Sequence, residues 1–373
     1  MKRFARHFVI TAFILALMAG LLVYAGVYNV SARAGHLAPT AWLLHFAMRK
    51  SARTYSLGIE VPPLEDERMI VRGATYFSIG CAACHGEPGN PHTPVVNEMT
   101  PQAPYLTPMI KAWKTRELFW IVDNGIKYTG MPAWATGTRP DEVWSMVAFL
   151  LKLPDLDVET YRKLAYEPGP NLEQRAAITN QELDEGVGTV LSQCARCHGY
   201  DGMGRGTGAF PFLAGQRQQY LLDAMRHFAT GERKSGIMQP IAGGLFETAM
   251  KDVAIHYANV QPETVPAQAG ADDVNIQRGA RIAAAGLERQ SVPACRHCHG
   301  PGNTADNPSF PRLAGQNEDY LAQQLKLWRD GTRGGAAYAE VMTRVAAGLD
   351  DAQIRDVAAY YASLPYFANS APR

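Results

Sequence analysis

Six cysteines stand in three pairs, and each pair is spaced by two residues and followed at once by a histidine. The stretches read Cys81-Ala-Ala-Cys84-His85, Cys194-Ala-Arg-Cys197-His198 and Cys295-Arg-His-Cys298-His299. This spacing is the attachment signature of c-type haem, because both thiols reach the vinyl groups of one porphyrin while the adjacent imidazole binds the iron. We therefore expect three covalently bound haem c groups, attached through Cys81, Cys84, Cys194, Cys197, Cys295 and Cys298, with His85, His198 and His299 as axial iron ligands.

Zinc binding and dithiol redox chemistry are the alternative interpretations of such pairs. A structural zinc site needs four ligands, usually from two pairs that lie close together in the sequence. Here the pairs lie about a hundred residues apart, and each carries its own histidine. The regular repetition of close pairs is also unlike a disulfide framework. These features favour haem.

A methionine is a suitable sixth ligand, because a soft thioether opposite histidine raises the reduction potential of the iron. Met131 follows His85 by 46 residues, in a proline-bounded turn before a segment with helical apolar spacing. We expect it to bind the first iron, with Met99 and Met109 as competitors.

The second half of the chain is an internal duplication. The stretch from Phe210 to Leu221 recurs one hundred residues later, from Phe310 to Leu321. Met238 follows His198 by 40 residues and aligns with Met342, which follows His299 by 43. These two methionines are the expected axial ligands, with Met203, Met225 and Met250 as unaligned competitors in the first copy.

Prolines follow the motif histidines at similar distances. Pro211 and Pro311 lie 13 and 12 residues after their histidines, and Pro104 is a weaker counterpart. A backbone carbonyl there can accept the second imidazole proton and fix the ring.

The N-terminus carries a run of some 23 uncharged, mostly apolar residues, 8–30, preceded by Lys2, Arg3 and Arg6. The run is long enough to cross a bilayer as one helix, and the basic residues place the N-terminus in the cytoplasm. A cleaved signal ending near Ala32 is the alternative. The segment around Trp42 is expected to lie at the membrane surface as an amphipathic helix or to pack on the first haem domain.

Each haem-bearing segment resembles a class I cytochrome c domain, and the last two together resemble the tandem di-haem cytochromes c that carry electrons to terminal oxidases. The resemblance covers roughly residues 67–365. It implies an all-α fold, with three tandem class I cytochrome c domains that follow the N-terminal transmembrane helix expected from the apolar run. It also implies haem domains in the periplasm, which this helix would anchor by a single pass of the inner membrane. The expected divisions are a cytoplasmic tip and anchor at 1–33, a juxtamembrane linker at 34–66, cytochrome c domains at 67–155, 181–262 and 263–373, and a linker at 156–180.

Histidine and methionine together leave no open position on the iron, so such a haem transfers single electrons. The first hypothesis is therefore not an enzyme but a tri-haem electron-transfer protein of a respiratory chain, placed between a quinol-oxidising complex and a terminal oxidase. The second is the cytochrome subunit of a periplasmic flavin- or quinone-dependent dehydrogenase, and the third is a peroxidase-type haem enzyme. The net charge of +1 does not indicate a nucleic-acid partner.

Two other features of the sequence resemble functional sites. The glycine-rich stretch Gly202–Gly208 is predicted to be a flexible loop at a haem edge, since it lacks the strand that precedes a phosphate-binding loop. His227, His256 and His297 are alternative ligands, of which His297 is expected to face solvent.

Overall fold

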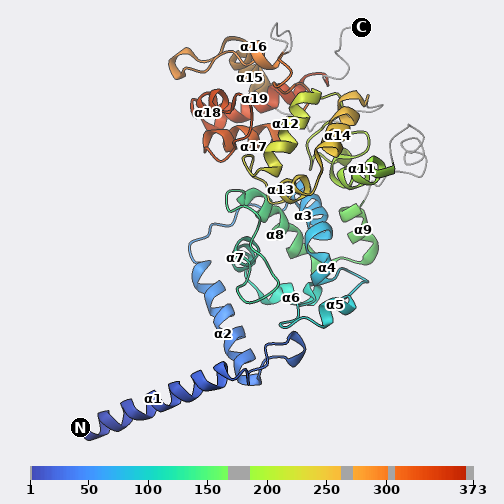
Figure 1. Ribbon diagram of the computed structural model, residues 1–373. Helices are drawn as coiled ribbons and strands as arrows, with labels where there is room; N and C mark the ends of the chain where they lie inside the picture. The colour runs from blue at the N-terminus through green and yellow to red at the C-terminus, as the bar shows by residue number, and fades with distance from the viewer. Residues whose placement is uncertain (1, 167–184, 262–271, 301–306, 367–373) are drawn as a thin grey trace.

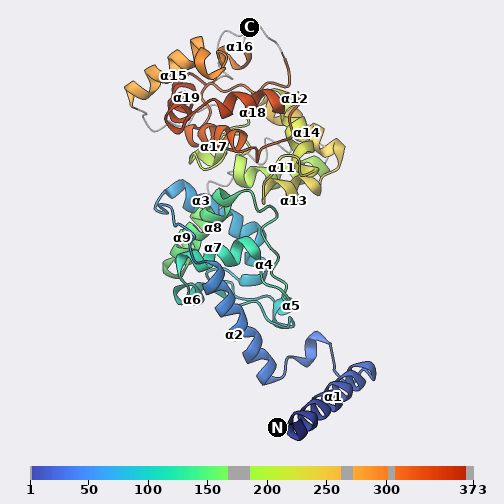
Figure 2. The same ribbon diagram turned by 90° about the vertical axis from the view of Figure 1, so that its left-hand side faces the viewer.

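The computed structural model describes residues 2–166, 185–261, 272–300 and 307–366 (Figure 1). Within these ranges the chain is helical and forms no strand, only three isolated β-bridges. The predicted all-α class is confirmed. The helices gather in three units, which we define as the first (residues 67–166), the second (185–261) and the third (272–366), and Figure 2 shows the same order from the side.

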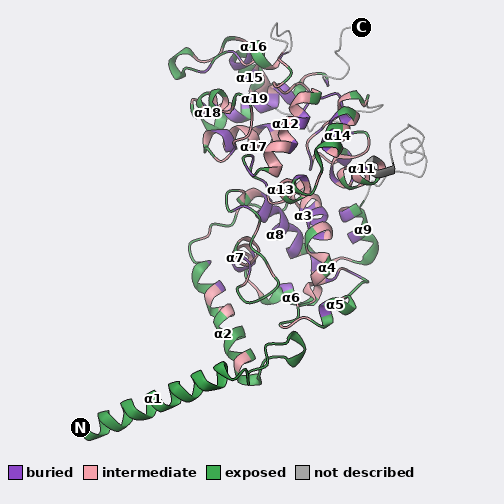
Figure 3. Cartoon of the chain, viewed as in Figure 1, coloured by how far each residue is buried: buried purple, intermediate pink, exposed green. Residues whose placement is uncertain are grey.

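Helix α1 (Lys2–Tyr24) has a mean hydropathy of 2.2 and no buried residue, so its length and composition suit a membrane span or a signal sequence (Figure 3). The helix begins before the apolar run 8–30 and ends before that run does. The end is set by Gly26, which adopts a φ of 68°. Val27 N–H then bonds to the Leu22 carbonyl at 3.1 Å, and Gly26 N–H to the Val23 carbonyl at 3.0 Å. This pair of bonds is a Schellman motif, which stops a helix whatever the polarity of the residues beyond it.

Helix α2 (Ala38–Tyr55) takes one of the two roles expected for this segment, packing on the first unit, and a position at the membrane surface stays a prediction. Its C-terminal half packs on the first unit, where Ala52 is fully buried and the Tyr55 ring stacks on Trp120 with centroids 6.0 Å apart. Its N-terminal half is uncovered, and Trp42 is 66% exposed.

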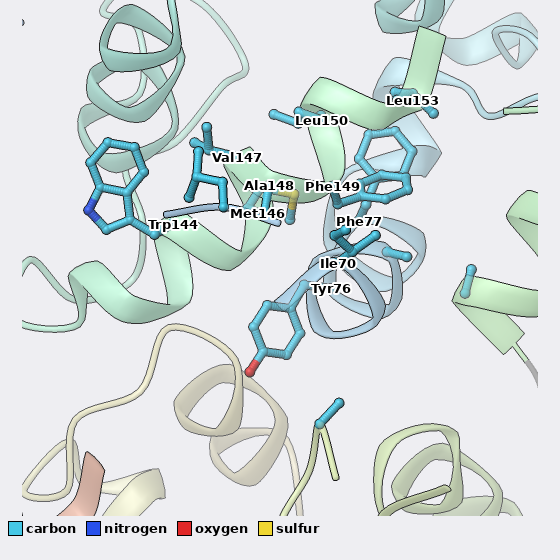
Figure 4. Packing of buried hydrophobic residues seen from close by; sticks show 14 of the residues in the cluster. Ile70, Tyr76, Phe77, Trp144, Met146, Val147, Ala148, Phe149, Leu150 and Leu153 are labelled. Carbon is cyan, nitrogen blue, oxygen red and sulfur yellow. The ribbon is translucent and has the colours of Figure 1, made fainter. Parts of the chain in front are cut away.

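The first unit is built on a crossing of its first and last long helices. Its helices are α3 (Glu67–Gly80), α4 (Ala82–His85), α5 (Pro94–Asn97), α6 (Leu106–Met109), α7 (Thr115–Asn124), α8 (Pro140–Lys152) and α9 (Val158–Tyr166). Helices α3 and α8 touch at Gly73, where a Cβ would lie 2.0 Å from the Ser145 carbonyl oxygen. Phe77 and Phe149 pack beside this contact, with ring centroids 5.2 Å apart (Figure 4). Tyr161 of α9, within the segment predicted as a linker, joins the same core.

The second and third units repeat one arrangement, as the duplication predicts. The second contains α11 (Glu185–His198), α12 (Gln218–Ala229), α13 (Met238–Gly243) and α14 (Glu247–Asn259). The third contains α15 (Asp273–Ala285), α16 (Arg296–His299), α17 (Glu318–Arg329), α18 (Ala339–Ala347) and α19 (Asp351–Ser363). In the third unit α15 crosses α19 at Gly279, where a Cβ would lie 1.9 Å from the Asp356 carbonyl oxygen. Helices α8, α14 and α19 are the closing helices of the first, second and third units.

The first and second units share buried surface. One hydrophobic cluster includes Tyr76 and Phe77 of α3 together with Cys197, Ala209 and Phe210 of the second unit. In Figure 4 the Tyr76 hydroxyl points away from Phe77, towards the pale yellow ribbon of the second unit.

The glycine-rich stretch Gly202–Gly208 is part of this contact, so the predicted flexible loop is wrong. Arg205, at a φ of 61°, is 5% exposed and reaches into the first unit. There its guanidinium donates to Thr75 Oγ1 at 2.7 Å and to the carbonyls of Lys163 and Leu164 at 3.2 Å. Burying an arginine requires such acceptors, and these hold the stretch in place.

Candidate haem sites

The three motif histidines make the same hydrogen bond. His85 Nδ1 lies 2.9 Å from the Pro104 carbonyl oxygen, His198 Nδ1 lies 3.2 Å from that of Pro211, and His299 Nδ1 lies 2.9 Å from that of Pro311. A carbonyl only accepts, so Nδ1 carries the proton and Nε2 keeps a lone pair for a metal. The prediction about the proline carbonyls is confirmed at all three positions, including the weaker one.

Burial favours the neutral form of these rings. It lowers the pKa of His85, His198 and His299, more than the hydrogen bonds to the proline carbonyls raise it. A neutral imidazole is the form that binds iron.

Four of the cysteines, with at least one in each pair, have the opposite character from redox or zinc thiols. Burial raises the pKa of Cys81 and Cys197 to about 12 and that of Cys194 and Cys295 to about 11. Dithiol chemistry and zinc binding require a thiolate with a lowered pKa. The six cysteines, all within the described ranges, form no disulfide, and no described cluster of His, Cys, Asp and Glu has the makeup of a metal site. In each pair at least one thiol is therefore held in its un-ionised form by burial, which fits thioether attachment.

The methionines divide into half-buried and core residues. Met131, Met238 and Met342 are half-buried, whereas Met203, Met225 and Met250 are fully packed in hydrophobic clusters. Met131 lies between α7 and α8, where its carbonyl accepts from Ile126 N–H at 3.1 Å. Met99 lies close by, with its terminal methyl packed against Gly130.

Met238 and Met342 occupy equivalent places, each in a short helix. Met238 begins α13 and Met342 lies within α18. The ends of the two helices correspond: Leu245 N–H bonds to the Ala242 carbonyl at 3.1 Å, and Leu349 N–H bonds to the Ala346 carbonyl at 3.0 Å. Met238 and Met342 therefore precede the ends of their helices by the same number of residues.

A second repeated contact fixes the backbone beside the histidines. Tyr257 donates its hydroxyl proton to the Gly199 carbonyl at 2.9 Å, and Tyr361 donates to the Gly300 carbonyl at the same distance. Gly199 directly follows His198, so the closing helix holds the chain at the motif.

Two arginines lie buried between the second and third units. Arg233 and Arg333 are 7% and 9% exposed; Arg233 donates to the Tyr320 hydroxyl at 3.0 Å and Arg333 to the Tyr220 hydroxyl at 3.3 Å. Within the described chain neither forms an ion pair with a carboxylate, and Arg333 Nε has no hydrogen-bond partner. Burial, together with the charge of Arg233, lowers the pKa of Arg333. Buried cations need an anion nearby, and the carboxylates of haem propionates have the right chemistry.

Other sequence candidates do not join these sites. His297 is exposed, as predicted. His227 Nδ1 bonds to Glu232 at 2.6 Å, and His256 Nε2 bonds to the Tyr200 carbonyl at 3.2 Å.

A helical protein with three Cys-x-x-Cys-His motifs, in each of which a proline carbonyl orients the histidine, has the attachment sites of a c-type cytochrome. Comparison with known proteins agrees. The family model "Cytochrome C oxidase, cbb3-type, subunit III" matches residues 68–150, and the model "Cytochrome c" matches residues 276–365. The chain belongs to the cytochrome c family, whose members carry covalently bound haem c and transfer electrons.

Individual relatives cover about half of this chain. The "Thiosulfate dehydrogenase electron acceptor" of Thiomonas intermedia is 36% identical over 174 residues, which are 47% of this chain and 79% of the relative. Cytochrome c4 of Pseudomonas aeruginosa is 31% identical over 173 residues, covering 46% of this chain and 83% of the relative. The solved structure of reduced cytochrome c4 from Pseudomonas stutzeri matches 48% of this chain and 97% of its own, at 29% identity and a TM-score of 0.43.

Proposed function

We propose that this chain is a membrane-anchored tri-haem cytochrome c that relays single electrons in the periplasm. One haem is attached in each unit, and the iron ligands are His85 with Met131, His198 with Met238, and His299 with Met342. The observation that carries the proposal is the repeated hydrogen bond from the histidine Nδ1 to a proline carbonyl beside each cysteine pair. It leaves Nε2 of each histidine available to an iron.

Haem iron with histidine and methionine ligands changes reversibly between ferrous and ferric and passes one electron at a time. The protein contributes ligands, apolar burial and fixed spacing. The proline carbonyls orient the imidazoles, and the buried pair Arg233 and Arg333 would supply the positive charge to neutralise haem propionates. Helix α1 supports the anchoring, because its exposed apolar surface suits a bilayer.

The relatives favour a dehydrogenase as the electron donor. Two of them are named as electron acceptors of thiosulfate dehydrogenase. The first unit instead matches the model of an oxidase subunit. We propose that electrons enter from a periplasmic dehydrogenase that oxidises a small sulfur compound such as thiosulfate and leave towards a terminal oxidase. The second candidate is entry from a quinol-oxidising complex, which the proposed anchor would keep within reach because such complexes lie in the membrane.

The test uses the full chain purified from membranes. The pyridine haemochrome spectrum should give three haems per chain, and the ferric protein should be low-spin. Met342→Ala should lower the reduction potential of one haem only, because the sulfur ligand raises it. A high-spin ferric haem in the native protein would contradict the proposed ligation.

The donor is tested by mixing the oxidised protein with a thiosulfate dehydrogenase and thiosulfate. Rapid reduction supports the first donor. Reduction only by a quinol-oxidising complex supports the second. Membrane attachment is checked by deleting residues 2–30 and replacing them with a cleavable signal, which should release the holoprotein into the periplasmic fraction.

A further inference from the structure

One buried carboxylate connects the methionine segments of the first and second units. Glu142, in the first turn of α8, is 2% exposed. Its Oε2 accepts from Trp134 Nε1 at 3.0 Å and from Gly236 N–H at 2.6 Å. Its Oε1 accepts from Ser235 Oγ at 2.6 Å and lies 3.0 Å from Arg139 Nη1. Four donors therefore converge on the two oxygens, two from each unit.

Each unit supplies its donors from next to its methionine. Trp134 follows Met131 by three residues, and Gly236 precedes Met238 by two. On the second side the link reaches the ligand residue itself, since Ser235 Oγ accepts from Met238 N–H at 3.0 Å. One hydroxyl therefore joins Glu142 to the backbone of Met238.

The two segments also touch directly. Gly236 lies against the Trp134 indole so closely that a Cβ on this glycine would stand 1.9 Å from Nε1. Arg139 strengthens the junction by donating to the Lys234 carbonyl at 3.0 Å. In Figure 1, α13 adjoins α8 and α3 at the boundary between the two units.

Aromatic rings line the same boundary. The Tyr76 ring is 6.3 Å from Trp134 and 6.4 Å from Phe210, centroid to centroid. Phe210 precedes Pro211, whose carbonyl holds His198. The segment that carries Met238 and the segment that orients His198 are thus both in contact with the first unit.

We propose that Glu142 is a positioning residue that holds the sulfur ligands of the first and second haems in place together, and that electrons pass between these two haems across this junction. The proposal rests on the ligation by Met131 and Met238 proposed above. The step is a transfer of one electron from a ferrous iron in one unit to a ferric iron in the other, with no bond made or broken. Removing the carboxylate would loosen both methionines at once.

The experiment compares Glu142→Gln with Glu117→Gln in the full holoprotein. Glu117 is a matched control, because it is a carboxylate of the same unit at 3% exposure, and its bond to Lys114 N–H caps α7 without reaching the second unit. Glu142→Gln places an amide N–H against the converging donors. We expect the far-red absorption band of sulfur-ligated ferric haem to weaken, two of three reduction potentials to fall, and electron equilibration between the first two haems to slow. Glu117→Gln should change none of these.

Two milder variants separate the sides and serve if Glu142→Gln does not fold. Trp134→Phe removes one donor and should lower only the potential of the first haem, whereas Ser235→Ala should lower only that of the second. The proposal is overturned if Glu142→Gln has the same spectrum and reduction potentials as the control. It is also overturned if Trp134→Phe and Ser235→Ala change no reduction potential. Met238→Ala then shows whether the ligation or only the role of Glu142 is wrong. If Met238→Ala also changes no reduction potential, the proposed ligation is wrong. If it lowers one potential, only the role of Glu142 is refuted.

Discussion

Two glutamines hold the second and third units together. Each side chain makes the same pair of hydrogen bonds to the backbone of one residue in the other unit. The Gln316 side chain accepts from Phe212 N–H and donates to the Phe212 carbonyl, both at 2.9 Å. The Gln216 side chain accepts from Arg312 N–H at 2.9 Å and donates to the Arg312 carbonyl at 3.0 Å. We predict that Gln316→Ala destabilises the protein markedly more than Gln216→Ala.

The magnitude follows from the burial of the partners. Phe212 is 2% exposed, so Gln316→Ala leaves one N–H and one carbonyl buried without partners. At about 1–3 kcal/mol for each unsatisfied group, the free energy of unfolding should fall by about 2–6 kcal/mol. Arg312 is only half-buried, so water can replace Gln216 at its backbone, and the loss should be about 1–2 kcal/mol.

The assay is guanidinium unfolding of the holoprotein, followed by helical circular dichroism. Gln218→Ala, at an exposed position that begins α12, is the control and should change the free energy of unfolding by less than about 0.5 kcal/mol. The double variant should cost less than the two single losses together, because one open contact hydrates the other. If Gln316→Ala costs no more than the control, the two glutamines do not hold the units together and the reasoning fails.

Two further predictions concern ligation and helix packing. Met238→Ala should lower the reduction potential of one haem in a potentiometric titration. Met250→Ala truncates a core residue and should cost about 2–5 kcal/mol of stability without lowering a potential. Equal potentials in both variants would contradict the ligand assignment. Gly279→Ala should destabilise the third unit by about 1–3 kcal/mol, because its Cβ would meet the Asp356 carbonyl. Gly188 has open space around it, so Gly188→Ala should stabilise α11 by about 0.5–1 kcal/mol. If chemical denaturation ranks the two variants in the reverse order, the proposed crossing is refuted.

Much of the haem environment can be predicted from local sequence. Cysteine and histidine spacing, and a proline 12 or 13 residues after the histidine, are short-range features, and the structure forms the hydrogen bonds predicted at Pro211 and Pro311. The duplication is equally informative, because the repeated residues alone align Met238 with Met342. The assignment of the sulfur ligands themselves stays a prediction.

The features that the sequence does not predict depend on backbone geometry or on distant partners. The apolar run continues past the end of α1, so it does not predict that end, which Gly26 sets through a left-handed turn. The glycine content of Gly202–Gly208 suggests a flexible loop, whereas Thr75, which binds Arg205 and holds the stretch, lies 130 residues away. Glu142 does not stand out in the sequence, since a glutamate in the first turn of a helix is ordinary and its partner Ser235 is 93 residues distant.

The sequence by itself determined the cofactor chemistry and the helical class, because covalent attachment and helix periodicity are written in residues a few positions apart. Only the tertiary structure decided how the units meet. Contacts such as Glu142 with Gly236 and Gln316 with Phe212 join side chains to backbone groups, which every residue carries and which leave no mark in the sequence. Burial then gives those few bonds their strength, since no water replaces them when they break.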